Sequence, residues 1–400
     1  MSSGLATYTD LNAVATHLRA KLATKKYILL FAYNGTGKTR LSMGFKNLGK
    51  IVVERDTLYF NAFTEDLFIW DNDLENDACR RMRLNMRSRF FEGIEAFDIE
   101  NKVREVLARY GSFNFKIRKE GLSKKEAEEE LHQQSITLEN GNYFINFVTF
   151  EREVVEDGAN KTVVDIKISR GEENLFLWCF FLAVAQLAFD AEDPNDPYGW
   201  VKNIYIDDPI SSLDENNLIF VACDLAQLIL EDKTSQGIVI STHHSLFFNI
   251  LSNEIKTGLG RTWEKKLVQY FFRFDGDEGN YHLREEKSDT PYSYHLTILE
   301  ELKKASTTNS IKIYHFNMMR SILEKTSAFF GFKVFTDCIK EEPKVQLYAR
   351  FLNLFSHGKD SFFSYREPDD AHKKLLKEVL DAYLGKYEFN LLDILSGSND

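Results

Sequence analysis

Short apolar runs alternate with longer helix-forming segments through the first two thirds of the chain. The runs Ile28–Phe31, Ile204–Ile206 and Gly237–Thr242 are apolar almost throughout, which is typical of strands buried on both faces of a sheet. Segments of helical composition, such as residues 216–230, lie between them. Strand and helix alternating at these lengths predict an α/β fold, with a mostly parallel sheet covered by helices on both faces.

The longest apolar run extends from Leu175 to Phe189 and contains the polar residue Gln186. A helix needs about 20 apolar residues to cross a bilayer, and this run is shorter. We therefore predict a helix buried in the protein core, and no association with a membrane.

Residues 71–160 interrupt the alternating pattern with a charged stretch, which we interpret as a helical insertion. Helix-forming composition predicts helices at 80–97 and 99–109, whereas apolar residues at 143–150 predict a strand. A further strand, leading into a loop, is predicted from the alternating residues at 57–66.

The pattern changes again near residue 256. Strand-like stretches at 266–274 and 281–283 are followed, from about residue 295, by helix-dominated sequence through residue 385. We therefore expect three parts: an α/β domain at 1–255, a connecting segment at 256–295 and a helical domain at 296–400.

Composition narrows the class of protein. A chain of 400 residues with 44% hydrophobic content is sufficient for two or three folded domains. The net charge of −11 argues against a surface made for non-specific nucleic-acid binding, although a local basic groove is compatible with it. The four cysteines are far apart, which indicates neither a disulfide scaffold nor a zinc site. The N-terminus lacks a signal-peptide pattern, so we expect a cytoplasmic protein.

A phosphate-loop pattern follows the first buried run directly and consists of Asn34, Gly35, Thr36, Gly37, Lys38 and Thr39. Gly35 and Gly37 allow the backbone to wrap around a polyphosphate, and N–H groups at the start of the following helix point at the anion. Lys38 would reach the terminal phosphates, and the Thr39 hydroxyl would hold Mg²⁺. Ala32 stands where the usual pattern has glycine. The pattern predicts a nucleotide site.

Adjacent carboxylates, Asp207 and Asp208, end the buried strand that contains Ile204 and Ile206. Asp207 could hold Mg²⁺ beside the phosphate loop, and Asp208 could polarise an attacking water. A solvated turn is the alternative, which the abrupt stop at Pro209 makes the weaker interpretation. We therefore predict nucleotide hydrolysis, with Thr39 and Asp207 as metal ligands.

Several segments, in this order, resemble the motifs of ABC-type ATPase heads of the SMC and repair branch. They are Asn34–Thr39 (Walker A), Ser169-Arg170-Gly171-Glu172-Glu173 (signature), Ile204–Asp208 (Walker B), Ser211–Asp214 (D-loop) and Thr242-His243 (switch). The resemblance implies a head that dimerises, with Ser169 and Gly171 of one subunit facing the nucleotide held by the other. His243 would sense the γ-phosphate; a strand-end histidine without that role is the alternative.

The chain departs from the ABC pattern at a few positions. Arg170 and Glu172 replace the glycine and glutamine of the usual signature, and Asp208 replaces the usual second glutamate, which indicates slow or altered hydrolysis. Glu65 is the candidate for the position of the Q-loop glutamine.

The helical C-terminal part carries a second group of chemically suggestive residues. Arg320 and Glu324 are four residues apart, on one face of a predicted helix. A later helix carries Arg350 and Asn353 and ends at His357. An arginine, a carboxylate and a histidine suit metal-free RNA cleavage through a 2′,3′-cyclic phosphate. The simpler alternative for Arg320 and Glu324 is a surface ion pair.

Over essentially its whole length the chain resembles PrrC-like bacterial anticodon nucleases. The resemblance rests on the phosphate loop with its flanking residues 31–42, on the compact ABC-type head, and on Arg320, Glu324 and the later His357. It implies that these three residues form the nuclease triad. The spacing of Arg350 and His357 also resembles HEPN ribonucleases, so either Arg320 or Arg350 is the closer partner of His357.

The same resemblance implies most of the expected biology. It implies cleavage of tRNA, with lysine tRNA as the expected substrate, in defence against phage and under the control of a silencing type I restriction–modification complex. It implies Mg²⁺ with GTP or ATP, dTTP as a further nucleotide, and a homodimer or larger homo-oligomer. Asp289, in a segment that resembles the family's tRNA-contacting stretch, is expected to bind substrate with Arg350 and Asn353.

A different class of function remains open from the sequence. The head could belong to a non-nucleolytic sensor or repair ATPase whose C-terminal domain only binds a partner. Toxicity on expression that depends on Arg320 and His357 would distinguish the nuclease from this alternative.

Overall fold

The computed structural model describes most of the chain, in ranges separated by short gaps. The described residues are 5–52, 55–61, 67–72, 80–93, 97–130, 133–156, 159–209, 215–231, 235–276, 279–286, 294–339, 345–357 and 368–387. They belong to two compact units, Gly4–Asp289, here called the head, and Thr290–Asp400, here called the C-terminal unit.

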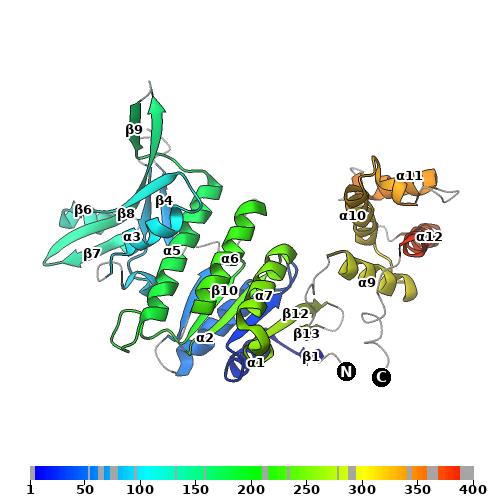
Figure 1. Ribbon diagram of the computed structural model, residues 1–400, viewed down its shortest axis with the longest axis horizontal. Helices are drawn as coiled ribbons and strands as arrows, with labels where there is room; N and C mark the ends of the chain where they lie inside the picture. The colour runs from blue at the N-terminus through cyan, green and yellow to red at the C-terminus, as the bar shows by residue number, and fades with distance from the viewer. Residues whose placement is uncertain are drawn as a thin grey trace. The chain divides into compact units, whose positions relative to one another are not determined.

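A seven-stranded sheet forms the centre of the head (Figure 1). Its order is β1-β13-β12-β2-β11-β10-β3, with the bounds Leu5–Tyr8 (β1), Tyr27–Phe31 (β2), Thr57–Asn61 (β3), Asn203–Asp207 (β10), Gly237–Thr242 (β11), Leu267–Asp275 (β12) and Asn280–Glu286 (β13). The strands from β12 to β3 are parallel, and β13 and β1 add an antiparallel edge. The predicted α/β fold with a mostly parallel sheet is confirmed.

Helices cover both faces of this sheet. The helices of the head outside its insertion are α1 (Leu11–Leu22), α2 (Lys38–Val52), α5 (Arg170–Asp190), α6 (Glu215–Glu231), α7 (Ser245–Leu259) and α8 (Trp263–Lys266), with the 3₁₀ helix η3 (Gly260–Thr262). On one face, Phe45 of α2 is buried in a cluster with Ile28 and Leu30 of β2. Phe31 points to the opposite face, where its ring contacts Phe248 of α7.

The strand predicted from residue 57 is confirmed as β3, which the structure describes as far as Asn61.

The insertion of the head is built on a second, antiparallel sheet (Figure 1). Its order is β4-β5-β8-β6, and β7 and β9 also pair with β8; the bounds are Phe68–Asn72 (β4), Arg80–Leu84 (β5), Phe113–Leu122 (β6), Ile136–Glu139 (β7), Asn142–Glu156 (β8) and Ala159–Val164 (β9). The helical elements beside it are α3 (Ile99–Leu107), α4 (Lys124–Glu129), η1 (Arg89–Phe91) and η2 (Gln133–Ser135). The expectation of a mainly helical insertion is therefore wrong, although the helix predicted at 99–109 and the strand predicted at 143–150 are present.

The helix predicted at 80–97 is wrong, because this segment begins with a strand. Its first part is strand β5, in which the side chains of Met82 and Leu84 are buried. Arg81 Nε and Arg83 Nη2 both donate to Asp71 Oδ2 of the neighbouring strand, at 3.1 and 2.6 Å. The charged residues alternate with apolar ones at a period of two, and a carboxylate on the adjacent strand pairs with them.

Helix α5 joins the two sheets of the head. It is long and apolar enough to cross a membrane by length and composition, but 83% of its apolar window is buried inside the protein, as the sequence predicts. Phe60 of β3 contacts Trp178 and Phe181, with ring centroids 5.5 and 4.5 Å apart. Phe176 contacts Phe150 of the antiparallel sheet at 5.1 Å. One helix thus supplies core to both sheets.

The C-terminal unit is helical, as predicted. Its elements are α9 (Tyr294–Thr307), α10 (Ile313–Phe330), η4 (Phe335–Ile339), α11 (Val345–His357) and α12 (Asp370–Lys386). They share a separate buried cluster that includes Leu299, Phe316, Leu323, Leu352 and Leu380.

The division between the parts differs from the expected one. Residues 256–286, expected as a connecting segment, belong to the head: they complete α7 and supply β12 and β13 of its main sheet. β12 is buried over most of its length because it pairs directly with β2, the strand that leads to the phosphate loop. The division between the units falls at residues 289 and 290.

We predict that Phe176→Ala lowers the free energy of unfolding of the head by about 3–5 kcal/mol, because it leaves a cavity between α5 and the antiparallel sheet. Phe220→Ala is the matched control: that ring is 61% exposed on α6, so its loss should change stability by less than about 0.5 kcal/mol. Urea denaturation measures both. Equal, small effects would show that α5 does not carry the core of the insertion.

Candidate functional site

The phosphate loop connects β2 to α2. Gly35 and Gly37 adopt φ angles of +83° and +100°, in the left-handed region that favours glycine, and α2 begins at Lys38. The strand, the glycine turn and the helix N-terminus predicted from the sequence are therefore all present. Such a turn allows backbone N–H groups to approach a phosphate closely.

The Lys38 side chain lies over this loop and is buried. Its Nζ is 3.2 Å from the carbonyl oxygen of Ala32 and 3.3 Å from Asn34 Oδ1. It also lies 3.6 Å from Asp208 Oδ2. A phosphate entering the loop would compete with Asp208 for the same ammonium group.

Asp207 lies at the end of β10, and its side chain is almost completely buried. Ser241 Oγ donates to Asp207 Oδ1 at 2.6 Å, and Ser42 Oγ donates to Oδ2 at 3.3 Å. Burial raises the pKa of this carboxyl, although hydrogen bonds from Ser241 and Thr39 act in the opposite direction. The negative charge of Asp207 is therefore incompletely compensated by its surroundings.

These residues fit a magnesium ion. The Thr39 hydroxyl lies close enough to Asp207 to lower the pKa of that carboxyl, and both side chains offer the oxygen ligands that Mg²⁺ prefers. A cation beside Asp207 would oppose the effect of burial, which raises the pKa of this carboxyl. Within the described ranges, no three His, Cys, Asp or Glu side chains gather into a group that could hold a metal ion.

Asp208 follows directly and is held by His243. Its backbone is left-handed, with φ of +51°, and its N–H donates to the carbonyl oxygen of Ser241 at 2.7 Å. His243 Nδ1 lies 2.6 and 2.7 Å from the two carboxylate oxygens, and Thr242 Oγ1 donates at 3.2 Å. An ionised carboxylate only accepts hydrogen bonds, so Nδ1 carries the proton.

The pKa of Asp208 is shifted downward, in the opposite direction to the pKa of Asp207. Burial alone would raise the pKa of Asp208, but the contacts with His243 and Lys38 outweigh it and lower the pKa below its ordinary value. A carboxylate with a lowered pKa and several donors is a poor proton acceptor. Release of His243 from Asp208 would make that carboxylate a stronger base.

The signature residues form the start of α5. Ser169 Oγ accepts from the backbone N–H of Glu172 at 3.3 Å, and Glu172 Oε2 accepts from the N–H of Ser169 at 2.8 Å. This is a capping box, and Arg152 of β8 forms an ion pair with the same Glu172. An added side chain at Gly171, in the first turn, would meet open space. Glu172 therefore has a local structural role that the sequence comparison with the usual signature missed.

Arg320 and Glu324 lie on one face of α10, as their spacing predicts, and they form the ion pair that the simpler alternative describes. Arg320 Nε donates to Glu324 Oε1 at 2.7 Å, on α10. The Arg320 guanidinium also lies over the ring of Phe335, 5.3 Å from its centroid. Only 14% of the Arg320 side chain is exposed, against 49% for Glu324. An arginine fixed on two sides is already oriented for binding an anion.

The remaining predicted positions are described only in part. Arg350 is exposed on α11. Asn353 and His357 belong to the same helix, of which His357 is the last residue, but their side chains lie outside the described residues. Asp289, Glu65 and the D-loop residues 211–214 also lie outside them.

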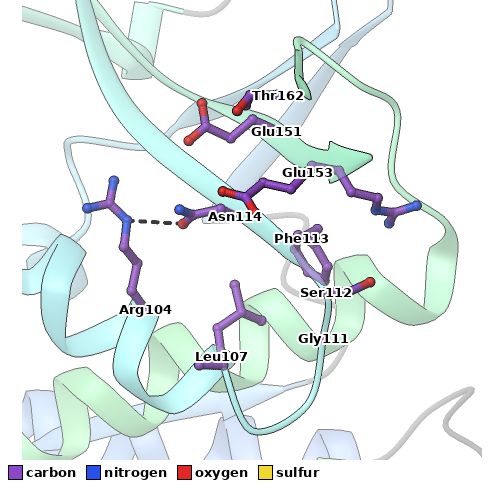
Figure 2. A pocket seen from close by; sticks show the side chains of 11 residues that line it. Arg104, Leu107, Gly111, Ser112, Phe113, Asn114, Glu151, Glu153 and Thr162 are labelled. Carbon is purple, nitrogen blue, oxygen red and sulfur yellow. Dashed lines mark hydrogen bonds between the residues drawn. The ribbon is translucent and has the colours of Figure 1, made fainter. Parts of the chain in front are cut away.

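A cavity of about 380 Å³ lies in the insertion, between α3 and strands β6, β8 and β9, and was not predicted from the sequence (Figure 2). Arg104 donates to Asn114 at its wall, and Glu151 and Glu153 line it from β8. Its wall carries charges of both signs, so it does not favour a polyphosphate. The alternating charges of β8 gave no signal that distinguishes such a cavity from a solvated sheet face.

Comparisons with known proteins identify a family model, a relative and a solved structure that are similar to this chain. A family model described as an AAA domain matches residues 152–384. The chain is 30% identical over 392 residues to an anticodon nuclease of Escherichia coli, covering 92% of this chain and 91% of that protein. A crystal structure of an Smc head bound to the C-terminal winged-helix domain of ScpA matches with 9% identity, over 66% of this chain and 90% of that chain, with a TM-score of 0.33.

We predict that Asp208→Asn lowers the free energy of unfolding by about 2 kcal/mol at pH 7, because hydrogen bonds to a charged group are lost while asparagine tolerates the left-handed backbone. The pKa of Asp208 is lowered in the folded protein, so its stabilising contribution is present above the ordinary carboxyl pKa and is lost as the pH falls through the folded value.

The stability difference between Asp208→Asn and the wild type should therefore shrink below about pH 4. Urea denaturation from pH 7 to pH 3 measures it, with the exposed Asp381→Asn as the control. A difference that stays constant over this range would contradict the assigned ion pair.

Proposed function

Because this chain belongs to the anticodon nuclease family, we propose that it is a nucleotide-hydrolysing enzyme that cleaves tRNA in the anticodon loop. The observation that carries the proposal is the 30% identity to the Escherichia coli anticodon nuclease, which extends through both the head and the C-terminal unit. The head carries the phosphate loop with Lys38 and Asp207, which suits nucleotide hydrolysis. The C-terminal unit carries the Arg320–Glu324 pair, which suits RNA cleavage.

We propose that the C-terminal unit cuts RNA by transesterification that needs no metal. The 2′-oxygen attacks phosphorus, the bond to the 5′-oxygen breaks, and a 2′,3′-cyclic phosphate and a 5′-hydroxyl result. His357 and Glu324 act as the general acid and base, and Arg320 stabilises the charge on the phosphorane. The fixed orientation of Arg320 against Glu324 and Phe335 supports Arg320 over the exposed Arg350 for this role. Arg350, Asn353 and Asp289 are proposed to contact the tRNA.

We propose that the head gates this reaction. ATP or GTP binds with Mg²⁺ at residues 34–39, Thr39 and Asp207 hold the metal, and Asp208 becomes the base for hydrolysis once His243 turns to the γ-phosphate. The contact between His243 and Asp208 supports a histidine that exchanges between two anionic partners. Ser169 and Gly171 of a second subunit complete each site, and dTTP is a further candidate ligand.

We propose the biological setting from the family to which this chain belongs. Lysine tRNA is the proposed substrate, a type I restriction–modification complex the proposed silencing partner, and defence against phage in the cytoplasm the proposed role. Acidic and basic residues balance in residues 290–400, so the net charge of −11 lies in residues 1–289. The C-terminal unit therefore does not share the acidic character that disfavours RNA.

The experiment that tests the proposal incubates the full-length protein with total tRNA and maps the ends by sequencing. Cuts confined to an anticodon loop and ending in a cyclic phosphate are expected. Intact tRNA under conditions in which the protein hydrolyses nucleotide would overturn the nuclease proposal and leave an ATPase with another client.

We predict that Arg320→Lys and Glu324→Gln each reduce the rate of tRNA cleavage by about 100-fold or more, because a fixed guanidinium and an acid–base group are lost. Nucleotide hydrolysis should persist. Glu128→Gln, which alters an exposed ion pair of the same i,i+4 spacing in α4, is the control and should cleave normally. Cleavage that survives both α10 changes would show that the nuclease site lies elsewhere.

A further inference from the structure

The end of α10 carries an exposed group of aromatic rings that the proposed nuclease chemistry does not use. Phe329, Phe330 and Phe332 are 84%, 52% and 38% exposed. Together with Tyr387 at the end of α12, they are here called the aromatic cluster. Burying rings of this size would stabilise the unit by about 2 kcal/mol each, so their exposure needs an explanation.

The rings of the aromatic cluster are arranged as a partial stack. Phe330 stacks on Phe332, with centroids 5.7 Å apart and planes 21° apart, and on Tyr387 at 5.5 Å and 22°. Phe329 meets Phe330 edge to face at 5.2 Å. Flat ring faces and edges are thus presented at the surface in a fixed order.

The backbone beneath the rings is fixed by a Schellman motif. Gly331 adopts φ of +70°, its N–H donates to Ala328, and the N–H of Phe332 donates to Ser327 at 2.8 Å. The Ser327 hydroxyl donates to the carbonyl oxygen of Phe332 at 3.2 Å. A ligand that binds these rings would therefore order few additional backbone torsions.

Exposed lysines lie close in the sequence to the rings of the aromatic cluster. They are Lys325, Lys333 and Lys386, and Lys386 Nζ lies 6.0 Å from the centroid of the Tyr387 ring. Basic residues outnumber acidic ones between residues 312 and 350. Aromatic rings among lysines are the combination that binds unpaired nucleic-acid bases, whereas a protein interface favours aliphatic and aromatic contact with few lysines.

Two rings of the aromatic cluster lie on the same helix as the Arg320–Glu324 pair. Phe330 follows Arg320 by ten residues on α10, about 15 Å along the helix axis. The segment that leaves the cluster leads directly to Phe335, the ring under the Arg320 guanidinium. An RNA strand at Arg320 would reach the aromatic cluster within a few nucleotides.

We propose that the aromatic cluster is a stacking site for unpaired RNA bases a few nucleotides away from the scissile phosphate. The proposal rests on the proposed tRNA nuclease function and adds a substrate-binding site to it. Single-stranded loops are the RNA elements whose bases are free to stack on aromatic side chains. The site selects an unpaired loop over a duplex, because paired bases offer no free face.

The test compares variants of the full-length protein at Phe329, the most exposed ring. Phe329→Ala and Phe329→Leu should raise the KM for tRNA by about tenfold, and Phe329→Trp should keep it near the wild-type value, because only a flat ring stacks. The kcat at saturating tRNA should be unchanged in all three. Phe220→Ala, on an exposed ring of the head, is the control.

A second readout uses the natural tryptophans, all of which lie in the head at Trp70, Trp178, Trp200 and Trp263. Phe329→Trp should add fluorescence that an anticodon stem-loop quenches and a fully paired RNA of equal length does not. Thermal unfolding of each variant verifies that it is folded.

The outcomes distinguish a failure of the proposed stacking site from a failure of the proposed nuclease function. A wild type that cleaves no tRNA defeats the proposed function itself. A wild type that cleaves, with an unchanged KM in Phe329→Ala and Phe329→Leu, overturns the stacking site alone. An unchanged KM with an altered sedimentation coefficient would assign the aromatic cluster to a protein interface instead.

Discussion

The burial of α5 on all sides is the constraint on which the head depends. Its rings pack against Phe60 of the parallel sheet and against Phe150 of the antiparallel sheet, so neither sheet has a complete core without it. The same helix begins at Ser169, whose cap is formed by Glu172 and tied through Glu172 to Arg152 on β8. A displacement of the insertion would therefore reach the signature serine through a rigid helix rather than through a loop.

The nucleotide site adds a second constraint, which is electrostatic. Two adjacent carboxylates have pKa values shifted in opposite directions by their surroundings: Asp207 upward by burial, and Asp208 downward by His243 and Lys38. Neighbouring groups shifted apart in this way suit different tasks, and the tasks that we propose are the binding of a cation by Asp207 and the later acceptance of a proton by Asp208. Because Lys38 and His243 both contact Asp208, a phosphate that draws either of them away changes the basicity of that carboxylate.

Much of the head could be predicted because its signals are local. Buried parallel strands require continuous apolar runs, and the phosphate loop requires glycine at left-handed positions 35 and 37. The strand at Arg80–Leu84 was missed because its arginines pair with Asp71, a partner that only the fold brings near. The sequence does not assign β12 and β13 to the head, because sequence distance hides the pairing of β12 with β2 and of β13 with β1.

The candidate nuclease site was predictable only in part, for a related reason. The Arg320–Glu324 contact follows from helical spacing, whereas the ring of Phe335 under Arg320 depends on the turn after α10. The joint arrangement of Arg320, Arg350 and His357 remains a prediction, since it involves a side chain beyond the described residues. The capping role of Glu172 could have been found from the Ser-x-x-Glu pattern at 169–172.

We propose that nucleotide bound by the head controls RNA cleavage by the C-terminal unit. The most direct measurement is the initial rate of tRNA cleavage by the full-length protein with and without ATP or GTP, compared with the same rates for Lys38→Ala. We expect the rate of tRNA cleavage to depend on nucleotide in the wild type and not to respond to nucleotide in Lys38→Ala. Equal rates with and without nucleotide in the wild type, at concentrations it demonstrably hydrolyses, would contradict it.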